Sequence, residues 1–503
     1  MKVVFFSTSA FFPLHFGLMM DEAEIMYRQG HEVYFVYCNN ATSFCSQNLT
    51  GKQGNCNLCR WSTRHAIHNL SKGIKILNIK DFYENTDNLV QFEFKSIDDI
   101  KSIEYKNVKI GYGVLSTYIS LTRNNEPIFD KTFYSYINNL LNVSRRLTDA
   151  CEKIIDFLIP DKVNVFNGRL FEFRPVLDYC ISKKIPVRSY DVIGGYGEEY
   201  YKLSFENCLP HNIKNYNNKV VDLWNSPEVS MEEKKRIGSS FYQNRRNGKP
   251  ACDKIYIKSQ QSGLLPSGWD DSKRNFVIFN SSEDEHVAVG DEYSSLDFFP
   301  SQIEGIRTML KMTEDKKDIH FYLRIHPNLS LIKYSYHKDL YKLAEAFSNI
   351  TVIPGSDKIS TYELMEKSEK VIVFGSTMGL ESSFWKKPVI NLAGCGYSQS
   401  GICFMPKDLP ELKDLLISKL TPKDNLFAVQ FGYFKMHRNE EDKYKFIDFN
   451  FKVVKYNNLD FKIVNYQKIL GSRRLFAILE KFVGRYYSIK DKSNPLVVPL
   501  EGR

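Results

Sequence analysis

Short hydrophobic runs alternate with helix-like patterns along most of the chain. The first hydrophobic run covers Lys2–Ser7, and a loop is predicted at Thr8–Gly17. Apolar residues then recur with helical spacing over Leu18–Gly30, and a second hydrophobic run follows at Glu32–Cys38. A strand, a crossover helix and a strand of these lengths predict two parallel strands, whose following loops lie at the carboxyl edge of the sheet.

Two series of such units are present. In the first half, helices are predicted around Asn142–Leu158 and Arg174–Lys184, and strands at Val163–Asn167 and Pro186–Tyr190. The second series has predicted strands at Phe276–Phe279, His320–Ile325, Ile350–Ile353 and Val371–Phe374 and predicted helices at Gln302–Thr313, Lys338–Phe347 and Ser360–Ser368. Strands that alternate with helices twice over predict an α/β protein. It would have two Rossmann-like, doubly wound domains facing each other across a cleft suited to a nucleotide.

The length of 503 residues also argues for more than one core, because domains commonly hold ~100–200 residues. We predict an N-terminal domain over residues 1–205, with a cysteine-rich insertion at 38–60, and a C-terminal domain over residues 273–424. Residues 206–272 are polar and contain Pro and Gly, so they are predicted to be a linker region. Residues 425–503 are predicted to form a basic C-terminal extension with helical character.

Charge and hydrophobicity narrow the classes of partner. The formal net charge is +9, and residues 425–503 hold 15 Lys and Arg against 8 Asp and Glu. Such a segment suits nucleic acid, anionic lipid or an acidic substrate, but no nucleic-acid-binding motif accompanies it, so nucleic acid is not predicted as a partner. No stretch reaches the ~20 apolar residues of a membrane span, and the apolar start of the chain lacks the features of a signal peptide. We therefore expect a cytoplasmic protein.

The basic extension contains one pattern of its own. Residues Arg473–Tyr487 predict an amphipathic helix whose apolar face is flanked by basic side chains. A helix of this kind can lie on anionic lipid, which predicts a peripheral contact with the inner face of the cell membrane. Packing of the same helix on the first domain is the alternative, and it is the more common arrangement for amphipathic helices.

The stretch VIVFGSTMGLESSFWKKPVIN, residues 371–391, joins a buried strand to a helix through small and hydroxyl residues. Backbone N–H groups from Gly375 onward would meet the N-terminus of the helix, where the helix dipole attracts phosphate or another anion. Ser376 and Thr377 add hydroxyl donors, and Glu381, one turn later, could accept hydrogen bonds from ribose hydroxyls. An ordinary strand-to-helix turn with an acidic residue in its first turn is the alternative.

The stretch FYLRIHPNL, residues 321–329, ends another strand at the same predicted edge. Pro327 fixes the exit of the chain, and the ring N–H of His326 could donate to a phosphate oxygen. Arg324 could form a forked pair with an anion. A satisfied loop histidine and a solvent-facing arginine are the alternative. A phosphate site shared by His326 and the Ser-Thr pair would explain both stretches at once.

The stretch FNSSEDEH, residues 279–286, follows the first strand of the second domain. Asn280, Ser281 and Ser282 are therefore predicted to lie at the carboxyl edge and line the cleft. Capping of a helix by Ser282, with Glu285 three residues later, is the alternative.

These stretches together resemble the nucleotide-binding half of bacterial capsule and lipopolysaccharide glycosyltransferases, over about residues 276–392. The residues that carry the resemblance are RIHPN, FNSSEDE with GDEY, and VIVFGSTMGLESSFWKKPVI. The group resembles two-domain GT-B enzymes that use CMP-activated acidic sugars such as Kdo, sialic and pseudaminic acids. Related transferases accept UDP- or CDP-linked donors, so the base stays open. By this resemblance, the phosphate would be held by His326, Pro327, Ser376 and Thr377 and the ribose by Glu381.

The resemblance also implies that the first domain brings the acceptor and the catalytic acid–base. Asp191 ends a predicted strand and precedes a Gly-Gly pair, so it is our first choice for the general base that deprotonates the acceptor hydroxyl. A turn-forming role for Asp191 is the alternative. Arg169, after the preceding strand, could hold the sugar carboxylate or the acceptor. The rivals of Asp191 are Glu198, Glu199 and, in the loop after the first strand, His15.

Four of the ten cysteines lie close together in the sequence. Cys38, Cys45, Cys56 and Cys59 form C-x6-C-x10-C-x2-C. Four thiolates with one C-x2-C pair suit a tetrahedral structural zinc site and, less well, an iron–sulfur cluster. The segment has little apolar content, so a metal would replace a missing core. Unliganded thiols or a redox pair are the alternatives.

The sequence thus predicts a glycosyltransferase that moves an acidic eight- or nine-carbon sugar from a CMP donor to a capsule, lipopolysaccharide or similar acceptor, either a glycan or a lipid-linked one. No catalytic metal is expected, because backbone N–H groups and the His and Ser-Thr side chains would stabilise the leaving phosphate. The alternatives are a UDP- or CDP-dependent glycosyl or alditol-phosphate transferase, a nucleotide-sugar epimerase of the same fold, and a non-catalytic scaffold for glycan assembly.

Overall fold

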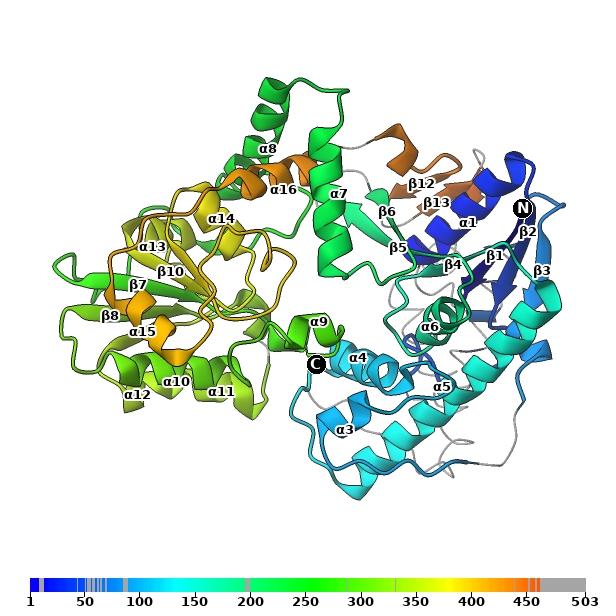
Figure 1. The fold of residues 1–503 in the computed structure, drawn as a ribbon, viewed down its shortest axis with the longest axis horizontal. Coiled ribbons are helices and arrows are strands. Elements are labelled where there is room, and N and C mark those ends of the chain that lie inside the picture. The colour runs from blue at the N-terminus through cyan, green and yellow to red at the C-terminus, as the bar shows by residue number, and fades with distance from the viewer. Residues whose placement is uncertain are drawn as a thin grey trace, which may run out of the picture.

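In the computed structural model the chain forms two α/β domains that stand side by side (Figure 1). The description covers residues 1–461 except 9–12, 43, 50, 52–55, 57–58, 61–62, 64–65, 68–69, 85–88, 195–199, 286, 331, 438, 451–452 and 457–458. Each domain is built on a mainly parallel sheet with helices packed around it. This confirms the predicted fold class of two Rossmann-like domains, the arrangement of GT-B proteins.

The sheet of the N-terminal domain has the order β3-β2-β1-β4-β5-β6, and only its pair β5–β6 is antiparallel. Its strands are β1 (Lys2–Ser7), β2 (Glu32–Tyr37), β3 (Lys75–Asn78), β4 (Lys162–Phe166), β5 (Val187–Gly194) and β6 (Tyr200–Glu206). The described helices of this domain are α1 (Pro13–Arg28), the 3-10 helix η1 (Ile79–Asp81), α3 (Ile97–Lys101), α4 (Ile110–Thr122), α5 (Lys131–Leu158) and α6 (Arg174–Ser182).

Local sequence explains the limits of the longest helix, α5. Asp130 caps its N-terminus, because the Asp130 carboxylate accepts a hydrogen bond from the Phe133 N–H at 2.8 Å. Ile159 ends it in a left-handed conformation. Between these ends, apolar residues recur with helical spacing, and they bury one face of α5 in the core of the domain.

Two predicted element limits in the first domain need correction. The first helix begins at Pro13 rather than Leu18, and β5 continues past Tyr190 to Gly194.

The sheet of the C-terminal domain has the order β11-β10-β7-β8-β9, and every pair is parallel. Its strands are β7 (Arg274–Phe279), β8 (Ile319–Arg324), β9 (Ile350–Ile353), β10 (Lys370–Val373) and β11 (Val389–Asn391). Its described helices are η3 (Glu283–Glu285), α9 (Asp291–Ser294), α10 (Gln302–Met312), η4 (Pro327–Leu329), α11 (Ser335–Tyr341), α12 (Leu343–Ala346), α13 (Thr361–Lys367), α14 (Met378–Phe384) and α15 (Leu409–Ile417). The strand order reverses between β7 and β10, which opens a crevice at their carboxyl ends.

Residues 206–272, predicted to be a linker region, contain two long helices, α7 (Ile213–Asn225) and α8 (Met231–Arg246), and the 3-10 helix η2 (Ile257–Ser259). Helix α16 (Leu426–Met436), from the predicted extension, packs on α8 and α7, and the three lie together beside both sheets (Figure 1). The contact between α8 and α16 requires glycine. A Cβ atom on Gly238 would lie 2.3 Å from the Val429 carbonyl oxygen, and one on Gly432 would lie 2.2 Å from the Gly238 carbonyl oxygen.

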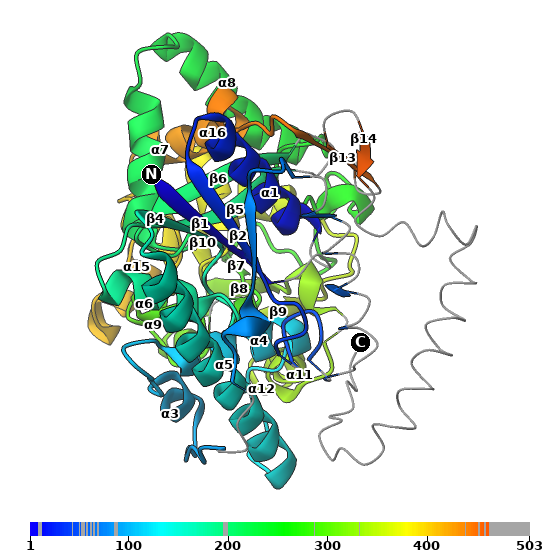
Figure 2. The same cartoon turned by 90° about the vertical axis from the view of Figure 1, so that its right-hand side faces the viewer.

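After α16 the chain returns to the N-terminal domain. The 3-10 helix η5 (Glu440–Asp442) leads to an antiparallel sheet of β12 (Ile447–Asn450), β13 (Val453–Tyr456) and β14 (Leu459–Phe461), which lies beside α1 (Figure 2). The backbone N–H of Phe446 donates to the buried Asp21 carboxylate of α1 at 2.7 Å, and Lys202 lies 3.1 Å from the same carboxylate. The hydrogen bond from Phe446 fastens the returning segment to the first domain.

The predicted amphipathic helix at Arg473–Tyr487 lies outside the described residues, so its membrane contact stays a prediction. Among the residues that the structure describes, no helix is both long enough and apolar enough to cross a membrane.

Candidate functional site

A pocket of about 70 Å³ lies at the carboxyl ends of β7, β8 and β10 in the C-terminal domain. Parallel strands end at one edge of a sheet, so side chains far apart in the sequence meet there. Seven residues that the sequence singled out line this pocket: Asn280, Arg324, His326, Pro327, Ser376, Thr377 and Glu381. The structure therefore brings together the three stretches that the sequence predicted to form one site.

His326 is held in place by its neighbours. Its backbone N–H donates to the Asn280 side-chain oxygen at 2.7 Å, and its ring Nδ1 accepts from the Asn328 N–H at 3.1 Å. In a neutral ring, an Nδ1 that accepts leaves the proton on Nε2, which is then the donor. The Tyr256 ring packs edge-on against the imidazole, with 5.2 Å between ring centroids. This geometry suits a histidine that donates a hydrogen bond at the pocket.

The turn between β10 and α14 requires Gly375, whose φ of +73° lies in the left-handed region. The Gly375 N–H donates to the Asn391 side chain at 3.1 Å. By contrast, the backbone N–H groups of Ser376 and Thr377 donate to no acceptor within the described part of the chain. The turn thus leaves two N–H groups and the Thr377 hydroxyl at the pocket, as an anion would need.

Glu381 lies in α14, one turn after this pair, and only 2% of its surface is exposed. Its Oε1 atom accepts from the Arg245 Nε at 3.0 Å, and its Oε2 atom accepts from the Tyr362 hydroxyl. A carboxylate has about four acceptor positions, so these bonds leave room for a ribose hydroxyl. The predicted ribose contact stays a prediction.

Arg324 lines the pocket but does not point a forked guanidinium into it. Its Nη1 and Nη2 atoms donate to the carbonyl oxygens of Pro354 and Asp357, both at 2.9 Å. Burial lowers the pKa of this arginine. Its Nε is left without a partner in the described part of the chain and is the nitrogen that an incoming group could engage. The two backbone contacts show that Arg324 holds the loop after β9.

Sequence reasoning missed part of this pocket. The missed lining residues come from the segment between the domains and from α13: Arg245, Ile255, Tyr256, Ile257, Gln260, Thr361 and Tyr362. The tertiary fold carries the segment after α8 across the mouth of the C-terminal sheet. Its polar sequence has no periodic pattern that would have indicated this position.

A second, larger cavity of about 390 Å³ lies between the two domains. The N-terminal domain contributes Ser120, Arg123 and Arg169, and the C-terminal side contributes Asp284, Glu285, Val289 and Tyr293, with His211 from the segment between them. Arg169 donates from Nη2 to the Ser120 hydroxyl at 2.9 Å, and its Nε has no partner among the described residues. Burial lowers the pKa of Arg169 and raises that of Glu285. Such groups in a cavity are typical of a reactive site.

Ser281 and Ser282 do not line either cavity. The Ser281 backbone N–H donates to the Gln302 side-chain oxygen at 3.1 Å, and the Gln302 side-chain amide donates to the Ser281 hydroxyl at 2.9 Å. Ser282 accepts from Arg123 at 2.5 Å and donates to Asp284 at 2.8 Å. Their hydrogen bonds hold the loop after β7 and join it to the other domain.

Asp191 and His15, two of the predicted catalytic residues, do not line either cavity. Asp191 lies within β5, where residues 191–194 pair with β6. Its carboxylate accepts a hydrogen bond from the backbone N–H of the next residue, Val192, at 2.8 Å. Burial raises its pKa. His15 lies in the first turn of α1 rather than in a loop and stacks on Phe166, with 3.5 Å between ring centroids. Burial lowers the pKa of His15 to about 3. Glu198 and Glu199 lie outside the described residues.

The four clustered cysteines meet at a cavity in the N-terminal domain. Within the described part of the chain, no three His, Cys, Asp or Glu side chains stand in a metal-binding arrangement. All ten cysteines are present as thiols rather than disulfides.

Fold and pocket together define a two-domain α/β protein with a pocket at the carboxyl ends of its second sheet. Residues 270–438 match the family described as capsule polysaccharide biosynthesis protein. This match confirms, for that part of the chain, the resemblance that the motifs predicted. No curated protein is detectably similar to the chain.

Several solved structures resemble the chain distantly. One is the structure of the β-Kdo 2,4 transferase KpsC from Thermosulfurimonas dismutans, which is 12% identical in sequence and has a TM-score of 0.34. The match covers 54% of this chain and 78% of that protein. The β-Kdo 2,7 transferase of the same KpsC is 12% identical with a TM-score of 0.31, covering 56% and 79%. The UDP-GlcNAc 2-epimerase of Methanocaldococcus jannaschii is 11% identical with a TM-score of 0.26, covering 86% and 98%. Such low scores support no functional argument.

Proposed function

We propose that the protein is a glycosyltransferase of capsule-type glycan synthesis that takes an acidic sugar from a CMP donor. The observation that carries the proposal is the pocket at the carboxyl ends of β7, β8 and β10. There, His326 and the N–H groups of Ser376 and Thr377 surround a space fit for a phosphate. In the proposed complex they stabilise the leaving phosphate, so the reaction needs no divalent metal. Glu381 accepts from the ribose.

The sugar would extend from the pocket into the cavity between the domains. The two sites adjoin along the loop after β7, since Asn280 lines the pocket and Glu285 lines the cavity. The Nε of Arg169, which has no partner among the described residues, would bind the carboxylate of an acidic sugar. We assign the acid–base role to Glu285 in place of Asp191, because Glu285 lines this cavity and its burial-raised pKa suits proton transfer.

A second candidate function, a nucleotide-sugar epimerase, is favoured by one observation. Two carboxylates, Asp284 and Glu285, line the cavity where the sugar ring would lie. An epimerase acts on the donor alone and needs acid–base groups beside the ring. Asp284, however, is engaged by Arg123 in an ion pair across the domains, which leaves Glu285 as the carboxylate available for proton transfer.

The proposed setting is the cytoplasm, where cysteines persist as thiols, the state of all ten in the structure. The proposed acceptor is a glycan or a lipid-linked glycan. Contact of the basic segment with the membrane is part of the proposal for a lipid-linked acceptor.

Product analysis tests the function. The protein is incubated with CMP-, UDP- and CDP-sugars, with and without a capsule or lipopolysaccharide acceptor, and both free nucleotide and the sugar products are measured. The proposal predicts acceptor-dependent release of CMP, reduced ~100-fold or more in Glu285→Gln. Conversion of a UDP-sugar to its epimer without any acceptor would establish the second candidate instead. Turnover of no donor by a folded, nucleotide-binding protein would contradict both.

A further inference from the structure

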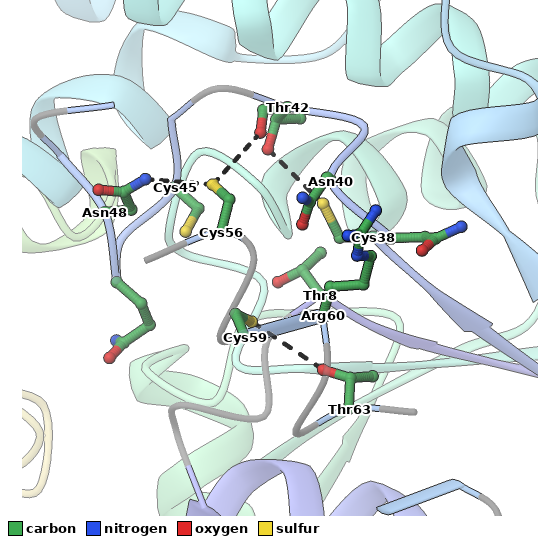
Figure 3. Close-up of a pocket in the computed structure, with 12 residues that line it drawn as sticks. Thr8, Cys38, Asn40, Thr42, Cys45, Asn48, Cys56, Cys59, Arg60 and Thr63 are labelled. Atoms are coloured by element: carbon green, nitrogen blue, oxygen red, sulfur yellow. Dashed lines mark hydrogen bonds between the residues drawn. The ribbon is translucent and has the colours of Figure 1, made fainter. Parts of the chain in front are cut away.

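A small cavity at the carboxyl edge of the N-terminal sheet is lined by four cysteines, Cys38, Cys45, Cys56 and Cys59, which we call the cysteine cluster. Figure 3 shows the four side chains around this one space. We propose that the cysteine cluster binds one zinc ion through four thiolates. The ion would join the end of β2 to the C-x2-C pair and stabilise this edge of the first domain.

The fold brings the cluster together from separate parts of the chain. Cys38 directly follows β2, and Thr8, which directly follows β1, lines the same cavity. Cys45 lies in a tight turn closed by reciprocal backbone hydrogen bonds with Asn48. The cavity has a volume of about 30 Å³. One bound water needs roughly 10–15 Å³, so this space suits a single ion and is small for a multi-iron cluster.

Polar groups lie close to the sulfur atoms. The Asn48 side-chain amide donates to the Cys56 sulfur at 3.1 Å, and the Cys56 thiol donates to the Thr42 carbonyl oxygen at 3.9 Å. The Thr42 hydroxyl lies 3.7 Å from the Cys38 sulfur, and the Thr63 hydroxyl lies 3.9 Å from the Cys59 sulfur. A donor such as the Asn48 amide stabilises a thiolate and orients it when it binds a metal.

A buried oxygen at the cavity provides a further observation. The Thr8 hydroxyl, which lines the cavity, has no hydrogen-bond partner in the described part of the chain. A buried polar group without a partner is costly, and a cation in the cavity would offset that cost. Arg60 lines the cavity as well and supplies one positive charge there.

No three potential ligands in the described chain stand in a metal-binding arrangement, so the proposed ion requires the cysteine side chains to turn. All four cysteines line one cavity, and in the proposed complex changes of side-chain rotamer bring the sulfurs toward its centre. Zinc imposes no geometric preference of its own beyond four-coordination and is satisfied by a set of four cysteines. This inference does not depend on the proposed transferase activity.

Elemental analysis of the full-length protein, purified without chelators, tests the inference. We expect about one zinc per chain in the wild type, and a loss of ~10-fold or more in Cys38→Ser and Cys56→Ser. Cys208→Ser is the matched control, because Cys208 is a half-buried thiol outside the cluster and should retain the metal. Asn48→Ala should weaken zinc affinity by ~10–100-fold without removing a ligand.

A second measurement keeps the inference testable if the cysteine variants fail to fold. Cobalt added to metal-free wild type should give thiolate-to-cobalt charge-transfer absorption, with one cobalt bound per chain. Circular dichroism reports folding separately. Protein free of metal with all four thiols reactive, a Cys56–Cys59 disulfide, or iron with inorganic sulfide in place of zinc would each overturn the inference.

Discussion

Arg245 of α8 and Glu381 of α14 form a buried ion pair, with the Nε and Nη2 atoms 3.0 and 2.9 Å from the same Oε1. The exposed fractions of the two side chains are 10% and 2%. The Tyr362 hydroxyl donates to the other carboxylate oxygen. The pair fastens the helical segment between the domains to the helix that follows the Gly-Ser-Thr turn, so one wall of the pocket at the carboxyl ends of β7, β8 and β10 depends on it.

Replacing Glu381 by glutamine should therefore destabilise the protein strongly. The variant leaves the buried Arg245 charge without its partner, and breaking a buried pair costs about 3–5 kcal/mol. Urea denaturation followed by fluorescence measures this free energy of unfolding. The control is Glu366→Gln, which breaks the more exposed Arg246–Glu366 pair nearby and should cost less than about 1 kcal/mol. Equal effects of the two changes would show that the buried pair has no special role.

A second ion pair joins the two domains. Arg123, at the end of α4, donates to the Asp284 carboxylate after β7 at 3.1 Å. The Asp284 side chain is 2% exposed. Asp284→Asn should reduce the free energy of unfolding by about 2–3 kcal/mol, because Arg123 then keeps a partly buried charge without a counter-ion.

A double-mutant cycle with Arg123→Met measures the coupling between these two residues. The exposed interdomain pair Lys109–Asp291, whose side chains are 39% and 65% exposed, is the control and should show a coupling below about 1 kcal/mol. If the effects of the Arg123 and Asp284 changes on the free energy of unfolding simply add, other contacts hold the domains together.

Stability should fall as the pH rises from about 4.5 to about 7 because of Glu283. Burial, aided by nearby carboxylates, raises the pKa of Glu283 to about 7, from 4.5. Below pH 4.5 this carboxyl is protonated in both the folded and unfolded chain, so its contribution is fully present. Between pH 4.5 and 7 the unfolded chain releases the proton first. The contribution is therefore lost over this range, and it amounts to about 3 kcal/mol.

Glu283→Gln keeps the oxygen that accepts from the Gln302 N–H, a bond of 2.6 Å in the wild type, but cannot ionise. Urea midpoints measured from pH 4.5 to 8 should fall less steeply in this variant, which should be the more stable protein at pH 8. Glu304→Gln, an exposed change on α10, is the control and should follow the wild type. If the urea midpoint of Glu283→Gln falls with pH as steeply as that of the wild type, other groups cause the pH dependence.

The sequence predicted most of the sheet strands because buried parallel strands are short apolar runs. Strand β9 was predicted with the limits that the structure gives, Ile350–Ile353. Helices α7 and α8 were missed because their faces are largely polar and they are stabilised by packing against α16 and by glycine contacts that no local pattern reveals. The antiparallel pairing of β5 with β6 was missed for a similar reason, and this moved Asp191 from a strand end into a strand.

The pocket at the carboxyl ends of β7, β8 and β10 could be predicted only in part. Side chains at the ends of parallel strands, such as His326 and Ser376, meet for a topological reason that sequence patterns carry. Arg245 and Tyr256 reach the pocket from a segment whose path depends on the whole fold. Glu285 lines the interdomain cavity because two domains come together around it, which a local pattern cannot show.

The most direct test of the account is calorimetric titration of the protein with CMP, CDP, UDP and GDP. We expect CMP to bind tightest, and affinity to fall ~10-fold or more in His326→Ala, which removes a charge-assisted hydrogen bond to phosphate. His320→Ala is the control, because His320 lies on β8, the strand that precedes His326, bonds Thr351 at 2.9 Å and stands outside the pocket. CMP binding that is lost in His326→Ala and kept in His320→Ala would support a CMP-sugar site at this pocket. Binding of no nucleotide, or CMP binding unchanged by His326→Ala, would contradict it.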